Sequence, residues 1–587
     1  MLVYRDRHCR VRASQMLADA LYQLERIAPG HAGAHDRAVR LLIDVGVLEA
    51  GVADAIHADA DSLCPVTDRL RAASVAAGHL TWHSWRGSHD EMARWLDRLR
   101  VALGAPAGEL PAEIETSVPE GYAYYGLYPE TYLSAAAEVA QSRSKPRVVC
   151  IGLRSIGTSL SAVVAAALEE LGREVRSLTL RPRGHPFDRR PRLSDSLAQL
   201  IQSHSDALFL LVDEGPGLSG SSLAGTARQL RELGVGDADI VLMPSWRTDG
   251  QELRSPKARE TWRRSAQFTA SFDEVWVSSG RLGDVVSGRR LEDLSAGAWR
   301  AVVYEGPARY PAVQPQHERR KFLARASGKD REPDLLLRFV GLGRYADGVV
   351  DRGQELAEAG FVMPPRRLEH GFMVTEFSQG EPVDRRDADE SLIDTMARYL
   401  AHIRRTRPAR SAVDSDLHAM ARANIAEGLG EAAGDGLSRW LDTWPMPAAE
   451  PPTALDARMF PYEWLRTTDG FVKTDALDHH DDHFYPGPQD IAWDVAGTCV
   501  EFGFSPARRA RFVERYRAAS GDRSIEARLP FHEVAYLAFR LGYATLAAET
   551  LGATTDGGRF RQQVGRYRRM LANALAHGAP GLTSAPA

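Results

Sequence analysis

From about residue 117 to residue 250, short apolar segments alternate with amphipathic segments, and no other feature of the sequence constrains the fold as strongly. Each apolar segment has the length and β-branched content of a buried strand, and most are followed by residues with helical spacing. The expected strands are RVVCIGL, EVRSLTL, ALFLLVD and DIVLMPS. Strands that alternate with helices form a parallel sheet with helices on its faces. The pattern therefore predicts a parallel-sheet domain over residues 116–250.

The other regions have different patterns, and 587 residues are too many for one hydrophobic core. Residues 1–115 have the apolar periodicity of helices, and residues 251–315 form a connector whose elements the sequence does not define. Residues 316–578 open with short strands and then become mainly helical. The tail, residues 579–587, is expected to be disordered. We predict an α/β multidomain protein with a helical N-terminal region and an α+β C-terminal domain.

Composition and charge exclude several classes of protein. Charged residues make up 26% of the chain and hydrophobic residues 44%, as in ordinary globular proteins. The net charge of −5 argues against nucleic-acid binding. No run of about 18 apolar residues is present, so we expect no membrane span. The N-terminus has charges where a signal peptide needs apolar residues. The four cysteines are widely spaced, which argues against a disulfide framework. We expect a cytoplasmic protein with small-molecule partners and no membrane contact, and the sequence leaves a homo-oligomer open.

The N-terminal region carries three histidines near tryptophans, His79, His83 and His89, which invite a metal-site interpretation. Isolated histidines of this kind are more often packing or surface residues than metal ligands. We therefore expect no metal site in this region.

The third expected strand ends in two acids and a loop of small residues, in the stretch LFLLVDEGPGLSGSS. The carboxylates of Asp213 and Glu214 can accept hydrogen bonds from sugar hydroxyls or hold a hydrated magnesium ion. The backbone amides of GLSGSS lead into a helix N-terminus and can bind a phosphate. A sugar phosphate would use both features. The alternative is a Rossmann-like sheet whose glycine-rich turns only connect elements.

This stretch resembles the phosphoribosyl-diphosphate motif of type I phosphoribosyltransferases. The resemblance implies that Asp213 and Glu214 bind the ribose and take part in catalysis, with Asp213 also a metal ligand. It places the 5′-phosphate loop at Leu218 to Ser222, with the binding residues Ser219, Gly220, Ser221 and Ser222. The Gly-Pro-Gly that follows the acids departs from the family pattern and changes the register of the loop.

Two further segments support the resemblance to phosphoribosyltransferases. IGLRSIGTSLSA resembles the pyrophosphate loop, which implies that the backbone around Arg154, Ser155 and Gly157 binds the diphosphate. RPRGHPFDRRPRLS lies where the family often has a mobile basic loop, which implies that Arg183 and His185 act on the leaving pyrophosphate. The implied ligands are phosphoribosyl diphosphate and Mg²⁺. Proteins of this fold also serve as ligand-binding regulators.

The second half resembles the aminoglycoside-phosphotransferase-like kinases. The segments LLLRFVGLGRY, VVDRGQELAEAGF and HGFMVTEFSQGEPV are similar to the small lobe of these enzymes. Arg338 occupies the position of the phosphate-contacting lysine, and Glu355 or Glu358 is its implied partner. Arginine is not a neutral replacement at such a point-charge contact. The resemblance implies ATP or another nucleoside triphosphate as a substrate.

The large-lobe resemblance lies between residues 455 and 497 and ends in GPQDIAWDVAG. It implies that Asp475 binds a metal ion and that Asp456 is the catalytic acid that orients the acceptor hydroxyl. The family's His before this acid and Asn five residues after it are absent, and Glu463 is the nearest polar candidate for the second metal ligand. The cluster DALDHHDDH is alternatively a dedicated transition-metal site or a solvated loop.

These resemblances together predict a bifunctional transferase. The first half would bind phosphoribosyl diphosphate for ribosyl-phosphate transfer, and the second half would phosphorylate a small molecule with a nucleoside triphosphate. The alternative is a nucleotide-sensing regulatory protein in which one or both halves are catalytically inactive.

Overall fold

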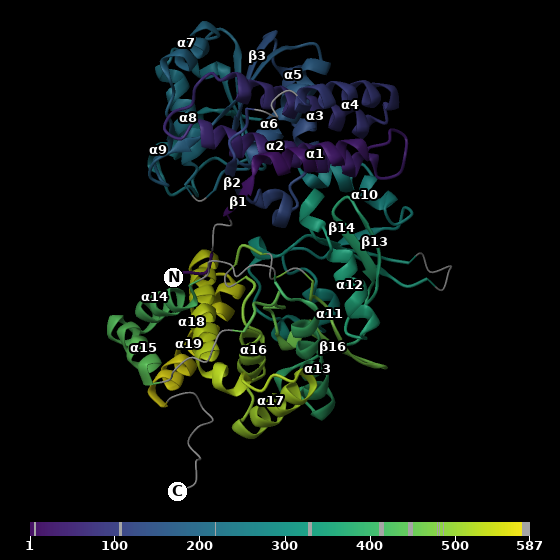
Figure 1. Cartoon of the computed structure of the whole chain (residues 1–587), viewed down its shortest axis with the longest axis vertical. Coiled ribbons are helices and arrows are strands. Elements are labelled where there is room, and N and C mark those ends of the chain that lie inside the picture. The colour runs from purple at the N-terminus through teal and green to yellow at the C-terminus, as the bar shows by residue number, and fades with distance from the viewer. Residues whose placement is uncertain are drawn as a thin grey trace.

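The computed structural model places the parallel sheet and the N-terminal helices in one half of the molecule and the C-terminal helices in the other (Figure 1). Leu218 of the expected phosphate loop and residues 579–587 of the expected disordered tail lie outside the described residues. The structure describes residues 1–4, 8–104, 109–217, 219–326, 332–409, 416–443, 450–477, 479, 482–484 and 487–577.

Five strands form the parallel sheet, in the order β4-β3-β7-β8-β9. Their bounds are β3 Arg147–Leu153, β4 Glu174–Leu180, β7 Leu208–Val212, β8 Ile240–Met243 and β9 Ala266–Gln267. All neighbouring strands run parallel, which confirms the sheet expected from the strand–helix alternation. Because β9 comes from the segment treated as a connector, the sheet continues beyond residue 250.

The strands of this sheet are unbroken apolar runs because both of its faces are covered. Along β7, Leu208 and Leu210 pack on one face with α6, whereas Phe209 and Leu211 pack on the other with α7, α8 and α9. These helices and their neighbour α5 are α5 Pro129–Ser142, α6 Ile156–Glu170, α7 Asp195–Ser203, α8 Ser221–Glu232 and α9 Pro256–Arg264. The short strands β5 Pro182–Arg183 and β6 Arg190–Pro191 pair antiparallel above the sheet's carboxyl edge.

The N-terminal region is helical, as expected, and packs on α6. Its helices are α1 Ala13–Glu25, α2 Ala34–Ile56, α3 Pro65–Arg86 and α4 His89–Gly104. The contact of α3 with α6 requires glycine at position 78, because a Cβ there would lie 2.5 Å from the carbonyl oxygen of Ala162. The sequence did not indicate the antiparallel pair of β1 His8–Arg12 and β2 Glu113–Ser117. The backbone N–H of Leu2 donates to Asn424 Oδ1 at 2.6 Å, so the first residues contact the second half.

His79 and His83 pack between the helices of this region, whereas His89 is exposed. His79 stacks on Trp95 with the ring centroids 3.7 Å apart. Its Nδ1 lies 2.8 Å from Glu170 Oε1 and its Nε2 lies 2.7 Å from Glu169 Oε2, and His83 also contacts Glu170. Ligand atoms of His79, His83 and Glu170 lie within 4.8 Å of one another. Both ring nitrogens of His79 are already paired with carboxylates, so the cluster joins α3 to α6, in keeping with the expected packing role.

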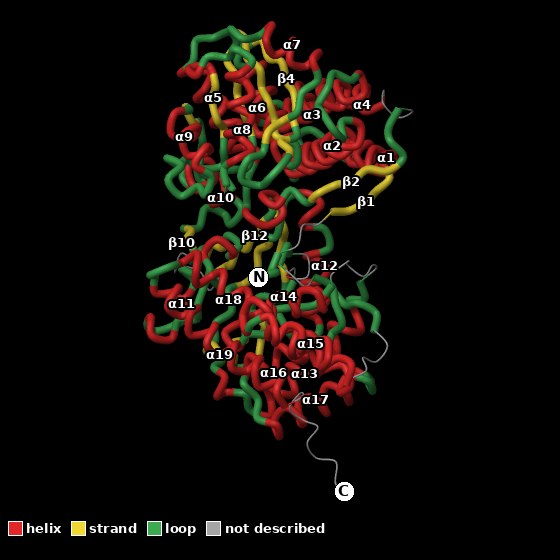
Figure 2. The backbone as a smooth tube through the Cα atoms, turned by 90° about the vertical axis from the view of Figure 1, so that its left-hand side faces the viewer, coloured by secondary structure: helices red, strands yellow, loops and turns green. Residues whose placement is uncertain are grey.

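The second half begins with an antiparallel sheet in the order β10-β11-β12-β14-β13. Its elements are β10 Leu291–Asp293, β11 Lys321–Ala324, β12 Leu335–Phe339, α12 Val349–Glu358, β13 Pro365–Glu369 and β14 Phe372–Glu376. This sheet shares one apolar core with the N-terminal helices and the parallel sheet, through Phe322, Leu337, Phe339, Phe372 and Val374. In Figure 2 it lies between the parallel-sheet half and the C-terminal helices, near the label β12. The segment 251–315 therefore contributes strands to two sheets and is not a simple connector.

The C-terminal helices have a separate apolar core. The remaining elements are α10 Arg281–Asp284, α11 Arg300–Val303, β15 Glu381–Pro382, α13 Glu390–Thr406, α14 Leu417–Leu429, α15 Glu431–Thr443, β16 Trp464–Thr467, β17 Gly470–Lys473, α16 Ala492–Phe502, α17 Pro506–Ser520, α18 Ile525–Leu551 and α19 Thr555–His577. Among the described residues, no helix combines the length and apolar character needed to cross a membrane.

Candidate functional site

The acids at the end of β7 lie at the carboxyl edge of the parallel sheet, where such sheets bind ligands. The carbonyl oxygen of Asp213 accepts a hydrogen bond from Tyr132 Oη at 2.8 Å, and Glu214 Oε2 accepts one from the Gly121 N–H at 3.2 Å. Burial raises the pKa of Asp213 to about 6. Burial and the nearby carboxylates of Asp213 and Glu120 raise the pKa of Glu214 to about 8. Neither acid forms an ion pair with another described residue, and both are suited to receive a cation or hydroxyl donors.

Several residues near these acids were not predicted. Gly121 and Tyr132 come from the segment before β3. No motif in that segment indicates that it lies beside the end of β7. Arg181 and Arg189 lie close enough to oppose the rise in the pKa of Asp213. They belong to the basic segment in which we had singled out Arg183 and His185 instead.

The structure engages the side chain of Arg183 and leaves His185 exposed. The Arg183 guanidinium donates to the carbonyl oxygens of His57, Ala58 and Arg181, which hold it at the end of α2. His185 Nδ1 accepts from the Phe187 N–H at 3.2 Å, within its own turn. The expected action of Arg183 on a leaving pyrophosphate is therefore not supported by this conformation, because its donors are already used.

The loop between β3 and α6 differs from the expected pyrophosphate loop at Arg154. Its N–H donates to the Leu180 carbonyl oxygen at 2.8 Å, and its buried guanidinium pairs with Asp54 at 2.7 Å and with Asp61. Arg154 is therefore a structural residue, which corrects the prediction. Ser155 has φ 120°, an unusual value for serine, and remains at the loop apex.

Gly157 packs this loop tightly against the end of β7. A Cβ at this position would lie 2.7 Å from the carbonyl oxygen of Val212. Close approach of this kind brings the backbone at Gly157 next to Asp213.

The expected phosphate loop leads into the N-terminus of α8 as predicted, with Gly220 in the left-handed region at φ 62°. The Gly220 carbonyl oxygen accepts from Trp262 Nε1 at 3.1 Å. Ser219 Oγ donates to Ser221 Oγ at 3.1 Å, and Ser221 Oγ donates to the Pro186 carbonyl oxygen at 2.6 Å. The Ser221 hydroxyl therefore fixes the basic segment, whereas Ser222 lies half-buried at the start of the helix.

Glu214→Gln is expected to stabilise the protein at alkaline pH. A carboxyl whose pKa is higher in the folded state than in the unfolded state loses stability as pH rises between those two values. Residue 214 of the variant cannot ionise, so its melting temperature should match that of the wild type near about pH 5 and exceed it near about pH 9. The difference should be roughly 2–4 °C for each kcal/mol of unfolding free energy that the wild type loses. Calorimetry at both pH values checks this, with the exposed Glu138→Gln as control. A difference in melting temperature that is the same at both pH values would contradict the raised pKa of Glu214.

The second candidate site is a cluster of charges between the small antiparallel sheet and β17. Arg338 Nη2 lies 2.7 Å from Asp475 Oδ1, and Lys321 Nζ lies 3.9 Å from Asp475 Oδ2. The sequence had assigned Arg338 to Glu355 or Glu358. In the structure Arg338 pairs with Asp475 instead, while Glu355 pairs with His402 at 2.9 Å and Glu358 accepts from Gln354 at 3.0 Å.

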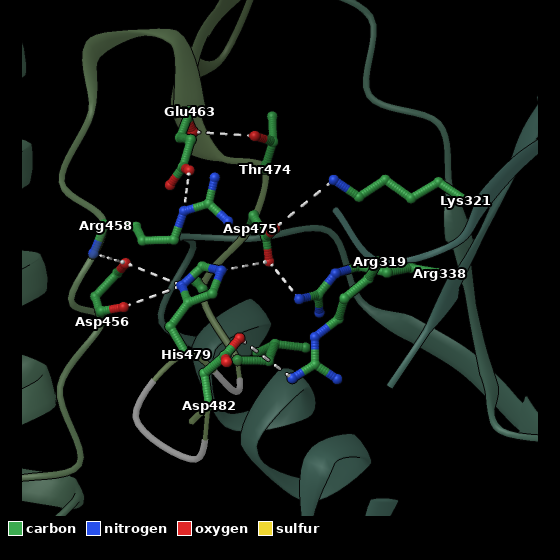
Figure 3. A network of polar contacts seen from close by, with 12 residues as sticks. Arg319, Lys321, Arg338, Asp456, Arg458, Glu463, Thr474, Asp475, His479 and Asp482 are labelled. Carbon is green, nitrogen blue, oxygen red and sulfur yellow. Dashed lines mark hydrogen bonds and ion pairs between the residues drawn. The ribbon is translucent and has the colours of Figure 1, made fainter. Parts of the chain in front are cut away.

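His479 connects the two aspartates that the sequence had singled out. Figure 3 shows its ring between the side chains of Asp456 and Asp475. Its Nδ1 lies 3.0 Å from the Asp456 carbonyl oxygen, and its Nε2 lies 3.4 Å from Asp475 Oδ1. Although burial lowers it, the two aspartates raise the pKa of His479 to about 9. Within the cluster expected to be a loop or a transition-metal site, His479 is thus held as an imidazolium.

Asp456 is not placed to orient an acceptor. Its side chain is 0% exposed, and its Oδ2 accepts from Tyr399 Oη at 2.5 Å. Its backbone N–H donates to Asp494 Oδ2 at 2.9 Å, as part of a buried connection to the start of α16. Although burial raises it, Lys473 and His479 hold the pKa of Asp456 well below its usual range. The predicted catalytic role is corrected to a structural one, because the carboxylate is sealed from both cavities described below.

The expected magnesium ligands do not fit a divalent cation. Lys473 Nζ lies 2.7 Å from Glu463 Oε2, 3.2 Å from Asp456 Oδ2 and 2.6 Å from the Asp475 carbonyl oxygen. The other oxygen of Glu463 pairs with Arg458 at 3.0 Å. Side-chain cations thus pair with the carboxylates of both expected ligands in this half: Lys473 and Arg458 with Glu463, and Arg338 with Asp475. A carboxylate already paired in this way is a poor ligand for Mg²⁺.

Two cavities adjoin at this cluster. The larger has a volume of about 610 Å³ and the smaller about 390 Å³. Lys321, Arg338 and Asp475 line the smaller cavity, and His479 lines the larger. Both are bordered by Trp299, Glu318, Arg458 and Tyr462. The Asp475–His479 contact therefore joins the wall of the smaller cavity to that of the larger.

No protein-family model matches the sequence, and no curated protein matches it either. Solved structures similar to about half of the chain are kinases. A choline/ethanolamine kinase family protein from Mesorhizobium loti has 17% identity and a TM-score of 0.31, over 44% of this chain and 88% of its own. An ethanolamine kinase from Plasmodium vivax has 10% identity and a TM-score of 0.34, over 61% of this chain and 95% of its own.

A spectinomycin phosphotransferase in complex with ADP and spectinomycin has 9% identity and a TM-score of 0.30, over 49% of this chain and 93% of its own. At these TM-scores the likenesses carry no argument about substrate or catalysis. Any function assigned to the second half must therefore rest on the residues of its own site.

Proposed function

We propose that the second half is a small-molecule phosphotransferase. A nucleoside triphosphate would bind in the smaller cavity and its acceptor in the larger one. The observation that carries this proposal is the chain of contacts Arg338–Asp475–His479, which joins the two cavities. Arg338 and Lys321 are cations on the wall of the smaller cavity, where they can bind phosphate oxygens. The sequence resemblance to aminoglycoside-phosphotransferase-like kinases supports the same arrangement.

The wall of the larger cavity suits a polar acceptor of modest size. It combines aromatic rings with charges of both signs, including Tyr304, Arg309, Asp384, Arg385 and Tyr543. Aromatic walls bind rings and alkyl groups, while the charged groups bind hydroxyls and ionic substituents. A small hydroxylated molecule fits this chemistry.

The acceptor half of the proposal is tested by ADP formation from ATP. The acceptors are choline, ethanolamine, spectinomycin and ribose 5-phosphate, each tried with and without Mg²⁺. At least one should stimulate ADP formation. Arg309→Ala changes an exposed wall residue of the larger cavity and should raise the KM for the acceptor while the KM for ATP stays unchanged.

Arg511→Ala, an exposed change on α17, is the matched control for that assay. ATP that binds without any acceptor-dependent turnover would contradict the phosphotransferase proposal. That result would favour the nucleotide-sensing alternative.

For the first half we propose binding of a sugar phosphate such as phosphoribosyl diphosphate. The observation that favours it is the pair Asp213 and Glu214, partly buried at the sheet edge without ion-pair partners among the described residues. These residues fit a hydrated magnesium ion, which would supply charge neutralisation for a diphosphate. Because Arg154 and Arg183 are engaged elsewhere, the proposal extends to binding and leaves transfer aside.

A further inference from the structure

The centre of the charge cluster in the second half is a buried lysine. The side chain of Lys473 is 0% exposed, at the end of β17, and the Asp456 side chain beside it is also 0% exposed. The ammonium contacts three oxygen sources: Glu463 at 2.7 Å, Asp456 at 3.2 Å and the Asp475 carbonyl at 2.6 Å. A buried carboxylate pair without a cation would be strongly destabilising, so this ammonium is a permanent part of the fold.

The third carboxylate of the cluster is also paired. Arg338 lies 2.7 Å from one oxygen of Asp475, and Lys321 lies 3.9 Å from the other. His479 approaches the same carboxylate at 3.4 Å (Figure 3). Glu463 and Asp475 are the acids expected to bind a metal, and side-chain cations already pair with both of them and with Asp456.

The chain's composition makes this arrangement notable. It contains only five lysines, and two of them, Lys321 and Lys473, contact this group of acids. An ammonium is a compact point charge with three donors, and a guanidinium is a wide planar group. The three donors of Lys473 match its three oxygen contacts, on Glu463, Asp456 and the Asp475 carbonyl.

We propose that the smaller cavity binds its phosphate-bearing ligand without a divalent cation, because Arg338 already pairs with the Asp475 carboxylate and Lys473 with that of Glu463. This inference rests on the proposed nucleotide site of the second half. Lys321 and Arg338, on the wall of the cavity, bind the phosphate oxygens directly. Asp475 pairs with Arg338 and does not coordinate a metal.

The test is the affinity of the wild-type protein for ATP, measured by calorimetry in EDTA and again in excess Mg²⁺. We expect the two dissociation constants to agree within about threefold. Affinity that rises more than about tenfold with Mg²⁺ would overturn the inference and leave the proposed nucleotide site standing. Absence of ATP binding in both conditions would overturn the nucleotide site and the inference with it.

Asp475→Asn distinguishes the two roles of that residue by the sign of its effect. If Asp475 is a metal ligand, the change lowers the affinity of the protein for ATP. If Asp475 only pairs with Arg338, the change releases the guanidinium and keeps or raises the affinity for ATP in EDTA. We expect the second result, with the exposed Asp469→Asn as control. A loss of more than about tenfold in the folded variant would overturn the inference.

Direct metal binding gives a readout that does not depend on ATP. Titration of Mn²⁺ followed by electron paramagnetic resonance should give the same result for wild type and Asp475→Asn, because neither holds an ion in the cluster. Lys473→Ala empties the position of the ammonium and should create a new Mn²⁺ site if it folds. A Mn²⁺ site present in the wild type and lost in Asp475→Asn would contradict the proposal, whatever the fate of the lysine variant.

Discussion

Arg338→Ala should reduce ATP affinity by roughly 100-fold, since a charged hydrogen bond contributes up to about 3 kcal/mol. Arg338 is 4% exposed, lines the smaller cavity and lies closer to the Asp475 carboxylate than Lys321 or His479 does. Its removal takes away a fixed phosphate-binding charge and leaves the Asp475 carboxylate with weaker partners. Calorimetric titration with ATP measures the change.

The control for this prediction is Arg338→Lys. Lysine keeps the positive charge, and the kinases that this half resembles have lysine at this position. The dissociation constant for ATP should therefore stay within about tenfold of the wild-type value. Unchanged affinity in Arg338→Ala, with the protein shown to be folded by circular dichroism, would remove the smaller cavity as the phosphate site.

The second large effect is expected in the first half. Asp213→Asn combined with Glu214→Gln preserves size and removes both negative charges, so magnesium-dependent binding of phosphoribosyl diphosphate should fall by an order of magnitude or more, about 1.4 kcal/mol per tenfold. The carboxylates are the groups at the edge of β7 that can receive both the metal ion and the ribose hydroxyls. Titration of wild type and variant with the ligand and Mg²⁺ measures the difference.

Asp195→Asn, an exposed change on α7, is the matched control. If the double variant is folded and binds the ligand as tightly as the wild type, the acids do not form a sugar-phosphate site. The parallel sheet would then be a scaffold whose glycine-rich turns only connect its elements.

The parallel sheet could be predicted because its central strands are long apolar runs buried on both faces. β7 and the helix α8 after it are clear in the sequence alone. By contrast β9 has two residues and β10 has three, and such short strands are defined by the neighbours with which they pair rather than by their own side chains. The segment 251–315 therefore could not be divided between two sheets in advance.

The acids of both sites could be located from the sequence, but their partners could not. The motif around Asp475 identifies an acid after a strand, yet it does not reveal that the Lys473 side chain turns back toward Glu463. Similarly, Arg154 lies in a loop of the right kind, and only the fold shows that Asp54 and Asp61 pair with it. Arg154 and these aspartates are 100 and 93 residues apart in the sequence, and charges so far apart leave no local pattern.

The central claim is that a nucleoside triphosphate binds between the small antiparallel sheet and β17. Hydrogen–deuterium exchange of the full chain, with and without ATP, tests it most directly because the method reports where protection appears. The account predicts ATP-dependent protection in residues 335–339, 372–380 and 470–477, and the same protection in EDTA. Protection confined to the parallel sheet, or no change anywhere at saturating ATP, would contradict it.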